Sequence, residues 1–199
     1  DDVSAHLLDA AGAEQVLVID AEGAALVARD TLGPAEPVEG LDEAVAFARV
    51  LALSTGLSRS SAADRVSLMV SMWLTGVALA APDMAVDYAK MREQFGQAIG
   101  AFQAIKHQCA DMATKAAAAE AQVLHTAVIF ENGQNDTAEV AAARILATDA
   151  ALANARANIQ IHGGMGFTAE CDAHLFLKRA HLLAVLGSNK AAERRRLLG

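Results

Sequence analysis

From about residue 64 to the end of the chain, apolar residues recur every three or four positions, which is the spacing of one face of an α-helix. Breaks in this spacing separate four helical stretches, which run from Asp64 to about Met91, from about Ala98 to Gly133, from Asp136 to Asn158, and from Cys171 onward. The connections are short, so we expect neighbouring helices to run antiparallel. The pattern predicts a mainly α fold in which residues 51–199 form a four-helix up-and-down bundle.

Individual residues indicate where these helices begin and where one of them bends. Pro82 falls inside the first helix, where a missing N–H and a bulky ring normally bend the axis. Asp136 and Glu139 have the spacing of a capping box at the start of the third helix, whose interior is dominated by alanine. The basic segment "KAAERRRLLG", residues 190–199, predicts a short exposed helical tail.

The first fifty residues have a different pattern. Two short apolar runs, "QVLVID" and "AALVARD", flank Ala21-Glu22-Gly23, which is a hairpin signal, and Gly33-Pro34 and Pro37 indicate a loop. An isolated hairpin is marginally stable in water because it cannot bury its apolar face. We therefore expect residues 1–50 to be the end of a β-domain, either because the chain is a fragment or because a partner completes the sheet.

Composition narrows the functional classes. The net charge of −8 argues against general nucleic-acid binding, which needs a basic surface. The longest apolar run, "VSLMVSMWLTGVALAAP", contains Ser71, Thr75 and Gly76, so we expect a buried helix and no membrane span. Met72 and Trp73 could belong to the core or to a pocket wall, and the core is favoured because apolar residues of a bundle helix are usually buried. Two cysteines imply no disulfide framework and fit a cytoplasmic compartment, and the N-terminus lacks the pattern of a signal peptide.

No metal site is predicted. His107 and Asp111 share one helical face, but no third ligand is evident in the sequence. A P-loop, a dinucleotide fingerprint after a strand, an HExxH motif and a CxxC motif are all absent from the 199 residues. Any evidence for a function must therefore come from motifs that are specific to a smaller group of proteins.

The stretch "IQIHGGMGFTAE", Ile159 to Glu170, is one such signal. Gly163, Gly164 and Gly166 would expose backbone N–H groups beside a helix end, where a ligand can approach the backbone closely. The alternative is a tight corner between two helices with glycines at positive φ, and the residues by themselves favour that alternative.

A second signal lies in the stretch from Tyr88 to Met112. Arg92, Gln94, Phe95 and Gln103 cluster at a predicted turn between helices. A guanidinium and an amide at a turn suit an anion such as a pyrophosphate, and Phe95 offers a flat apolar wall.

Together the two stretches resemble the C-terminal helical domain of the acyl-CoA dehydrogenase family. The family shows an Arg-x-x-Phe-Gly turn, a glutamine eleven residues after that arginine, and a later Gln-x-x-Gly-Gly-x-Gly-(Phe/Tyr) loop. The corresponding residues here are Arg92-Glu-Gln-Phe95-Gly96, then Gln103, then Gln160-Ile-His162-Gly163-Gly164-Met-Gly166-Phe167. The resemblance covers the chain from about Asp64 to its end, and the preceding hairpin fits the end of the family's middle β-domain.

The resemblance implies an FAD site that is shared between subunits. In the family this bundle assembles into dimers and tetramers, and these two motifs contact the FAD of a neighbouring subunit. By that likeness Arg92 and Gln103 would meet the FAD pyrophosphate, with Gln94 and Phe95 nearby. Gln160, His162, Gly163 and Gly164 belong to the loop that would lie against the adenine-ribose side.

The same resemblance leaves this chain without a catalytic base. The family removes the α-proton of an acyl-CoA with a glutamate and passes the β-hydride to the flavin. At the two positions where the family places that glutamate, this chain has Gly187 or Ser188 and Val66. Asp64 lies two residues from the second position and on a different side of the helix. We therefore predict no catalytic residue in this chain.

Some actinobacterial members of the family pair two unlike subunits and act on steroid side-chain CoA thioesters. The resemblance implies a subunit of this kind, in a heterotetramer with two copies of each subunit, which shares the acyl-CoA substrate and completes the partner's FAD site. Two alternatives stay open: an active homomeric dehydrogenase that uses another acid such as Asp64, and a non-enzymatic assembly subunit without flavin. The sequence does not identify the acyl group, the partner or the electron acceptor.

Overall fold

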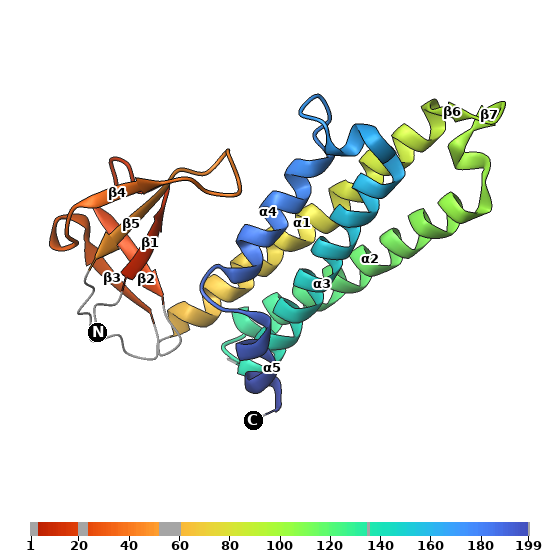
Figure 1. Cartoon of the computed structure of the whole chain (residues 1–199). Helices are drawn as coiled ribbons and strands as arrows, with labels where there is room; N and C mark the ends of the chain where they lie inside the picture. The colour runs from red at the N-terminus through yellow and green to blue at the C-terminus, as the bar shows by residue number, and fades with distance from the viewer. Residues whose placement is uncertain (1–3, 20–23, 52–60, 135, 199) are drawn as a thin grey trace. The chain divides into compact units, whose positions relative to one another are not determined.

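The computed structural model describes residues 4–19, 24–51, 61–134 and 136–198 (Figure 1). Contacts between residues divide the chain into two compact units, Asp1–Arg65 and Val66–Gly199. The predicted boundary between residues 50 and 51 stays a prediction, because residues 52–60 lie outside the described part of the chain.

The first unit contains five short strands, which are β1 (Ser4–Leu8), β2 (Gln15–Ile19), β3 (Ala24–Ala28), β4 (Ala35–Val38) and β5 (Phe47–Leu51). β2 and β3 pair in antiparallel register, from Gln15 opposite Ala28 to Ile19 opposite Ala24, as predicted. The turn of that hairpin, residues 20–23, lies outside the described residues.

The other three strands form an antiparallel sheet in the order β1-β5-β4, which the hydrophobic pattern did not predict. The expected loop around Pro37 is wrong, since Pro37 lies within β4. β4 is an edge strand of its sheet, where a residue without an N–H is tolerated. Leu7, Leu32 and Val50 are buried together, so the hairpin belongs to a larger β unit with its own small core.

The second unit confirms the mainly α prediction, with five α-helices in its described residues. They are α1 (Ser61–Met91), α2 (Gln103–Glu131), α3 (Thr137–His162), α4 (Ala173–Val185) and α5 (Lys190–Leu198). Figure 1 shows the first four side by side in an elongated bundle. Asp136 caps α3 as predicted, because its carboxylate accepts the N–H groups of Ala138 and Glu139 at 2.8 and 3.3 Å.

Two predicted helix limits are wrong. The second helix begins at Gln103 and not near Ala98, because the intervening residues form a two-stranded turn and the 3-10 helix η2 (Ile99–Ala101). The third helix continues past Asn158 to His162. The basic end of the chain forms a short and mostly exposed helix, as predicted. It contacts α3, and its Glu193 is fully buried.

α3 lies at the centre of the bundle, in contact with α2, α4 and α5. Its buried face is made mostly of alanine, which lets the backbones of neighbouring helices approach closely. The main core combines this face with larger residues from the other helices: Leu68, Val70, Leu74, Val123 and Leu183. The alanine-rich third helix of the sequence is therefore the packing centre of the domain.

Pro82 lies inside α1, and a side chain from α3 compensates for the hydrogen bond that it removes. A proline at position 82 has no N–H to donate to the carbonyl of Ala78, four residues earlier. The side-chain amide of Asn154 donates to that carbonyl at 2.8 Å and to the carbonyl of Met112 at 2.9 Å. Asn154 is fully buried, so this one residue links α1, α2 and α3 by polar contacts in the interior.

α1 is long and apolar enough, by length and composition alone, to cross a membrane. That signal is weak, because the core helix of a folded bundle meets the same criteria. Two of its hydroxyl groups bond within the helix: Ser71 donates to the carbonyl of Ser67 at 2.7 Å, and Thr75 to that of Ser71 at 2.9 Å. The expected burial of two α1 residues is wrong, since Met72 is 42% exposed and Trp73 is 62% exposed.

Candidate cofactor site

The turn after α1, which contains Arg92, is a tight hairpin. β6 (Glu93–Gln94) pairs with β7 (Gln97–Ala98), which leaves Phe95 and Gly96 as the two turn residues. Both have positive φ, 55° and 81°, as a type I′ turn requires. Glycine adopts this conformation freely, but phenylalanine does so only with strain.

The strained Phe95 side chain is 92% exposed. Among the described aromatic residues, its ring lies near that of Phe102 in an edge-to-face arrangement, with centroids 6.2 Å apart and planes at 87°. Burial of the ring in this chain therefore does not explain why an aromatic residue stands at a strained turn position. The geometry leaves a flat apolar surface free for contact with another molecule.

The backbone of Arg92 is held on both sides while its side chain is exposed. Its N–H donates to the carbonyl of Tyr88 at 2.8 Å, and its own carbonyl accepts the N–H of Ile99 at 2.8 Å. Over the described residues, no carboxylate lies within ion-pair distance of the Arg92 guanidinium. Gln94 and Gln103 are also exposed, the latter as the first residue of α2.

The glycine corner, which we define as Gly163–Phe167, is a single 3-10 turn after α3. Gly163 ends the helix with φ 59° and ψ −137°, a conformation accessible essentially to glycine alone. At Gly166 an added Cβ would lie 2.6 Å from the carbonyl oxygen of Ile159, so there is no room for a side chain. These two glycines are explained by the fold.

Gly164 is different. Its φ is not positive, and an added Cβ would meet no atom within 4 Å. Among the residues that the structure describes, no neighbour requires a glycine at position 164. The tight-corner hypothesis thus accounts for Gly163 and Gly166 and leaves Gly164 without an explanation, while Gln160 on the same surface is exposed.

His162, the residue before the glycine corner, lies inside the bundle. It is 5% exposed, and its ring stacks on that of Tyr88 with centroids 4.1 Å apart and planes at 25°. Its Nδ1 lies 2.8 Å from the carbonyl oxygen of Asn158, which can only accept, so Nδ1 carries the proton. This stack brings the ends of α1 and α3 together. The two sequence motifs therefore meet at one end of the bundle, as Figure 1 shows for the β6–β7 turn and the α3–α4 connection.

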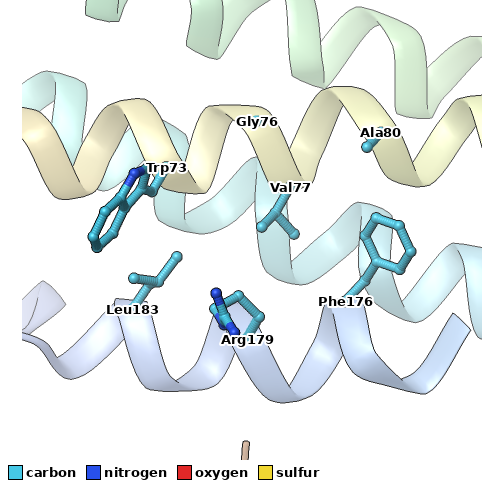
Figure 2. Close-up of a pocket in the computed structure, with 7 residues that line it drawn as sticks. All are labelled: Trp73, Gly76, Val77, Ala80, Phe176, Arg179 and Leu183. Atoms are coloured by element: carbon cyan, nitrogen blue, oxygen red, sulfur yellow. The ribbon is translucent and has the colours of Figure 1, made fainter. Parts of the chain in front are cut away.

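A separate groove of about 350 Å³ runs between α1 and α4. It is lined by Trp73, Gly76, Val77, Ala80, Phe176, Arg179 and Leu183. Figure 2 shows Trp73 facing Leu183 at one end and Phe176 near Ala80 at the other. The sequence left Trp73 open as a pocket-wall residue, but the other lining residues were not predicted, because they have the same helical spacing as core residues.

Residues 61–197 match the family model of the acyl-CoA dehydrogenase C-terminal domain, which covers well over half of the chain. The chain belongs to the acyl-CoA dehydrogenase family. Its curated relatives include acyl-CoA dehydrogenase FadE34 of Mycobacterium tuberculosis, which is 39% identical over 73% of this chain and 22% of its own length. Acyl-CoA dehydrogenase IpdE2 of Mycolicibacterium smegmatis is 36% identical over 91% of this chain and 57% of its own length.

Solved structures show the same acyl-CoA dehydrogenase fold. Butyryl-CoA dehydrogenase of Megasphaera elsdenii superposes with a TM-score of 0.85 at 20% identity, over 100% of this chain and 59% of that one. The steroid acyl-CoA dehydrogenase Tcur3481-Tcur3483 superposes with a TM-score of 0.87 at 24% identity, over 98% of this chain and 57% of that one. This acyl-CoA dehydrogenase chain thus spans little more than half the length of these structures.

The two positions expected for an acyl-CoA dehydrogenase base hold no acid in this chain. Gly187, in the connection between α4 and α5, has φ 75°, so its backbone conformation explains the glycine. Ser188 is half-buried, and Val66 packs against the main core of the bundle. Asp64, the neighbouring acid, is half-buried in the first turn of α1.

A buried arginine anchors the α4–α5 connection. Arg144 of α3 is 2% exposed, and its Nη2 donates to the carbonyls of Leu183 and Leu186 at 2.5 and 2.9 Å. Burial lowers the pKa of Arg144 to about 10, and the charge of Glu193 opposes that shift, so the guanidinium stays protonated at neutral pH. The described residues contain no group of three or more His, Cys, Asp or Glu side chains that could hold a metal ion.

Proposed function

We propose that this chain is a subunit of an FAD-dependent acyl-CoA dehydrogenase that completes the FAD site of a partner subunit and does not supply the catalytic base. The reaction of the assembly would be the α,β-desaturation of an acyl-CoA thioester. The observation that carries the proposal is Gly164, a glycine with open space around it and no reason within the chain, next to an exposed surface that carries both family motifs.

The exposed groups fit a dinucleotide. The Arg92 guanidinium, with no acidic partner over the described residues, would bind the pyrophosphate, and Gln103 would donate its amide to the same group. Gln94 and Phe95 would lie beside it, with the exposed Phe95 ring as an apolar wall.

The glycine corner fits the other part of the cofactor. The bare backbone of Gly163 and Gly164 would admit the adenine-ribose portion, where a Cβ would intervene, and exposed Gln160 would offer hydrogen bonds at the same surface. His162 would support this surface from the interior, since it is almost fully buried.

The absence of an acid at Gly187, Ser188 and Val66 supports a division of labour between subunits. Removal of the weakly acidic α-proton of a thioester needs a carboxylate beside it, and none of these residues can accept a proton at neutral pH. When bound, FAD would accept the hydride from the β-carbon. The partner subunit would then provide the base, while this chain binds and orients the cofactor.

A further finding supports a heteromeric assembly. The name of a solved steroid acyl-CoA dehydrogenase with the same fold joins two components, Tcur3481 and Tcur3483. By this likeness we propose a heterotetramer, and a steroid side-chain CoA thioester as the substrate class.

Flavin retention tests the proposal. The chain would be co-purified with an acyl-CoA dehydrogenase subunit that carries the missing glutamate, and the complex is expected to be yellow. Arg92→Ala and Gln103→Ala should each weaken FAD binding about tenfold or more, because each removes a hydrogen bond to a charged group. Arg195→Ala, which removes an exposed arginine on α5, is the control and should leave FAD affinity unchanged. Unchanged affinity in both motif variants would contradict the proposal.

A further inference from the structure

The rings of Tyr88 and His162 join the two motif-bearing segments from the inside. Tyr88 lies in the last turn of α1 and His162 is the last residue of α3. Their stacked rings, 4.1 Å apart between centroids, are the aromatic contact between these helix ends. Tyr88 is half-buried and His162 almost fully buried, so both rings belong to the packed end of the bundle.

Each ring is directly connected to a residue of the proposed FAD surface. The carbonyl of Tyr88 accepts the N–H of Arg92 at 2.8 Å, so a shift of Tyr88 would shift the arginine turn. His162 precedes Gly163 in the chain, and its Nδ1–H donates to the carbonyl of Asn158, which restrains the ring along the axis of α3. Movement of the His162 ring would therefore be transmitted to the glycine corner.

We infer that Tyr88 and His162 are positioning residues, whose stack sets the spacing between the Arg92 guanidinium and the bare backbone of Gly163 and Gly164. This inference rests on the proposed function. A dinucleotide would span both surfaces at once, so its affinity depends on how well their spacing is preorganised, as well as on the groups that they present. His162 then contributes to FAD binding through its buried ring, which lies beneath the surface that faces the cofactor. Tyr88, which belongs to neither motif, contributes in the same way.

The experiment compares three variants in the complex of this chain with its companion subunit. Tyr88→Leu removes the stacking partner and is expected to weaken FAD affinity about tenfold, the factor that corresponds to loss of a well-placed aromatic pair. Tyr88→Phe keeps the ring and is expected to bind FAD like the original chain. Val123→Ala, a truncation in the main core cluster away from the stack, lowers thermal stability and should leave FAD affinity unchanged.

A second measurement needs no cofactor. In the chain without FAD, backbone amide hydrogen exchange should become faster at residues 92–99 and 163–168 in Tyr88→Leu and stay unchanged there in Val123→Ala. His162→Gln, which keeps a donor for the Asn158 carbonyl and removes the ring, gives the same answer if Tyr88→Leu does not fold.

The outcomes separate this inference from the proposed function. If Arg92→Ala weakens FAD binding while Tyr88→Leu and His162→Gln bind normally, the positioning role is wrong and the cofactor site stands. If Val123→Ala weakens FAD binding as much as Tyr88→Leu, the stack acts only through general stability and the inference is also wrong. If neither Arg92→Ala nor Gln103→Ala affects FAD affinity, the proposed function fails and the positioning role fails with it.

Discussion

The connections before and after α4 each contain a glycine at a position that the acyl-CoA dehydrogenase pattern marks: Gly164 in the glycine loop, and Gly187 where the family can place its glutamate. The fold accounts for one of these glycines and not for the other. Gly187, between α4 and α5, adopts φ 75°, and this conformation accounts for the residue. Gly164, between α3 and α4, has neither a positive φ nor a close neighbour. Gly76 in α1 is also unobstructed, so open space by itself does not mark a ligand surface. What distinguishes Gly164 is its place beside Gln160 and Gly163 in the second family motif.

The α4–α5 connection should respond to mutation mainly in stability. Arg144→Met removes the side-chain donor from the carbonyls of Leu183 and Leu186 and one positive charge near the buried Glu193, whose carboxylate still pairs with Arg196 at 3.1 Å. We expect the free energy of unfolding to fall by about 2–4 kcal/mol, because hydrogen bonds from a charged donor contribute about 1.5–3 kcal/mol each. Urea unfolding followed by circular dichroism measures this. Arg194→Met, an exposed arginine on α5, should change stability little, and an equal loss in both variants would show that the anchoring role is wrong.

Within the glycine corner, Gly166→Ala should lower stability, whereas Gly164→Ala should lower FAD affinity and leave stability unchanged. The new Cβ at position 166 would lie 2.6 Å from a backbone oxygen, so the free energy of unfolding should fall by about 1–3 kcal/mol, as for other overpacked sites.

At position 164 the new methyl group meets open space, so stability should hold while FAD affinity in the complex falls about tenfold. Thermal melts and flavin titration measure the two quantities. Equal FAD affinity for Gly164→Ala and the original chain would remove the distinction between the two connections.

Gly187→Ala should have the smallest effect. A Cβ at φ 75° is strained and is expected to cost about 1 kcal/mol of stability, with no change in FAD affinity. The same titration and melt apply. Loss of flavin in this variant would mean that the α4–α5 connection also belongs to the cofactor surface.

Helical spacing predicted the bundle, but the number of strands and the roles of several helix residues were not predictable. β1, β4 and β5 are short, and Pro37 within β4 indicated a loop, because a local pattern does not reveal that a strand will lie at a sheet edge. Trp73 was expected in the core and is mostly exposed, because an apolar residue at helical spacing does not show which neighbours will cover it. The residues of the candidate site came from motifs and not from periodicity, and their role as an FAD site remains a prediction.

The sequence by itself determined the features that depend on residues close together in the chain. The Asp136 cap, the helix periods and the order of the two motifs are of this kind, because caps and periods arise from contacts within about one helical turn. Only the tertiary structure decided which glycine is required by its surroundings, that His162 faces Tyr88, and that Asn154 satisfies the carbonyl freed by Pro82. These features depend on backbone positions that lie far apart in sequence, such as Ala78 and Asn154, and their approach is set by the packing of whole helices.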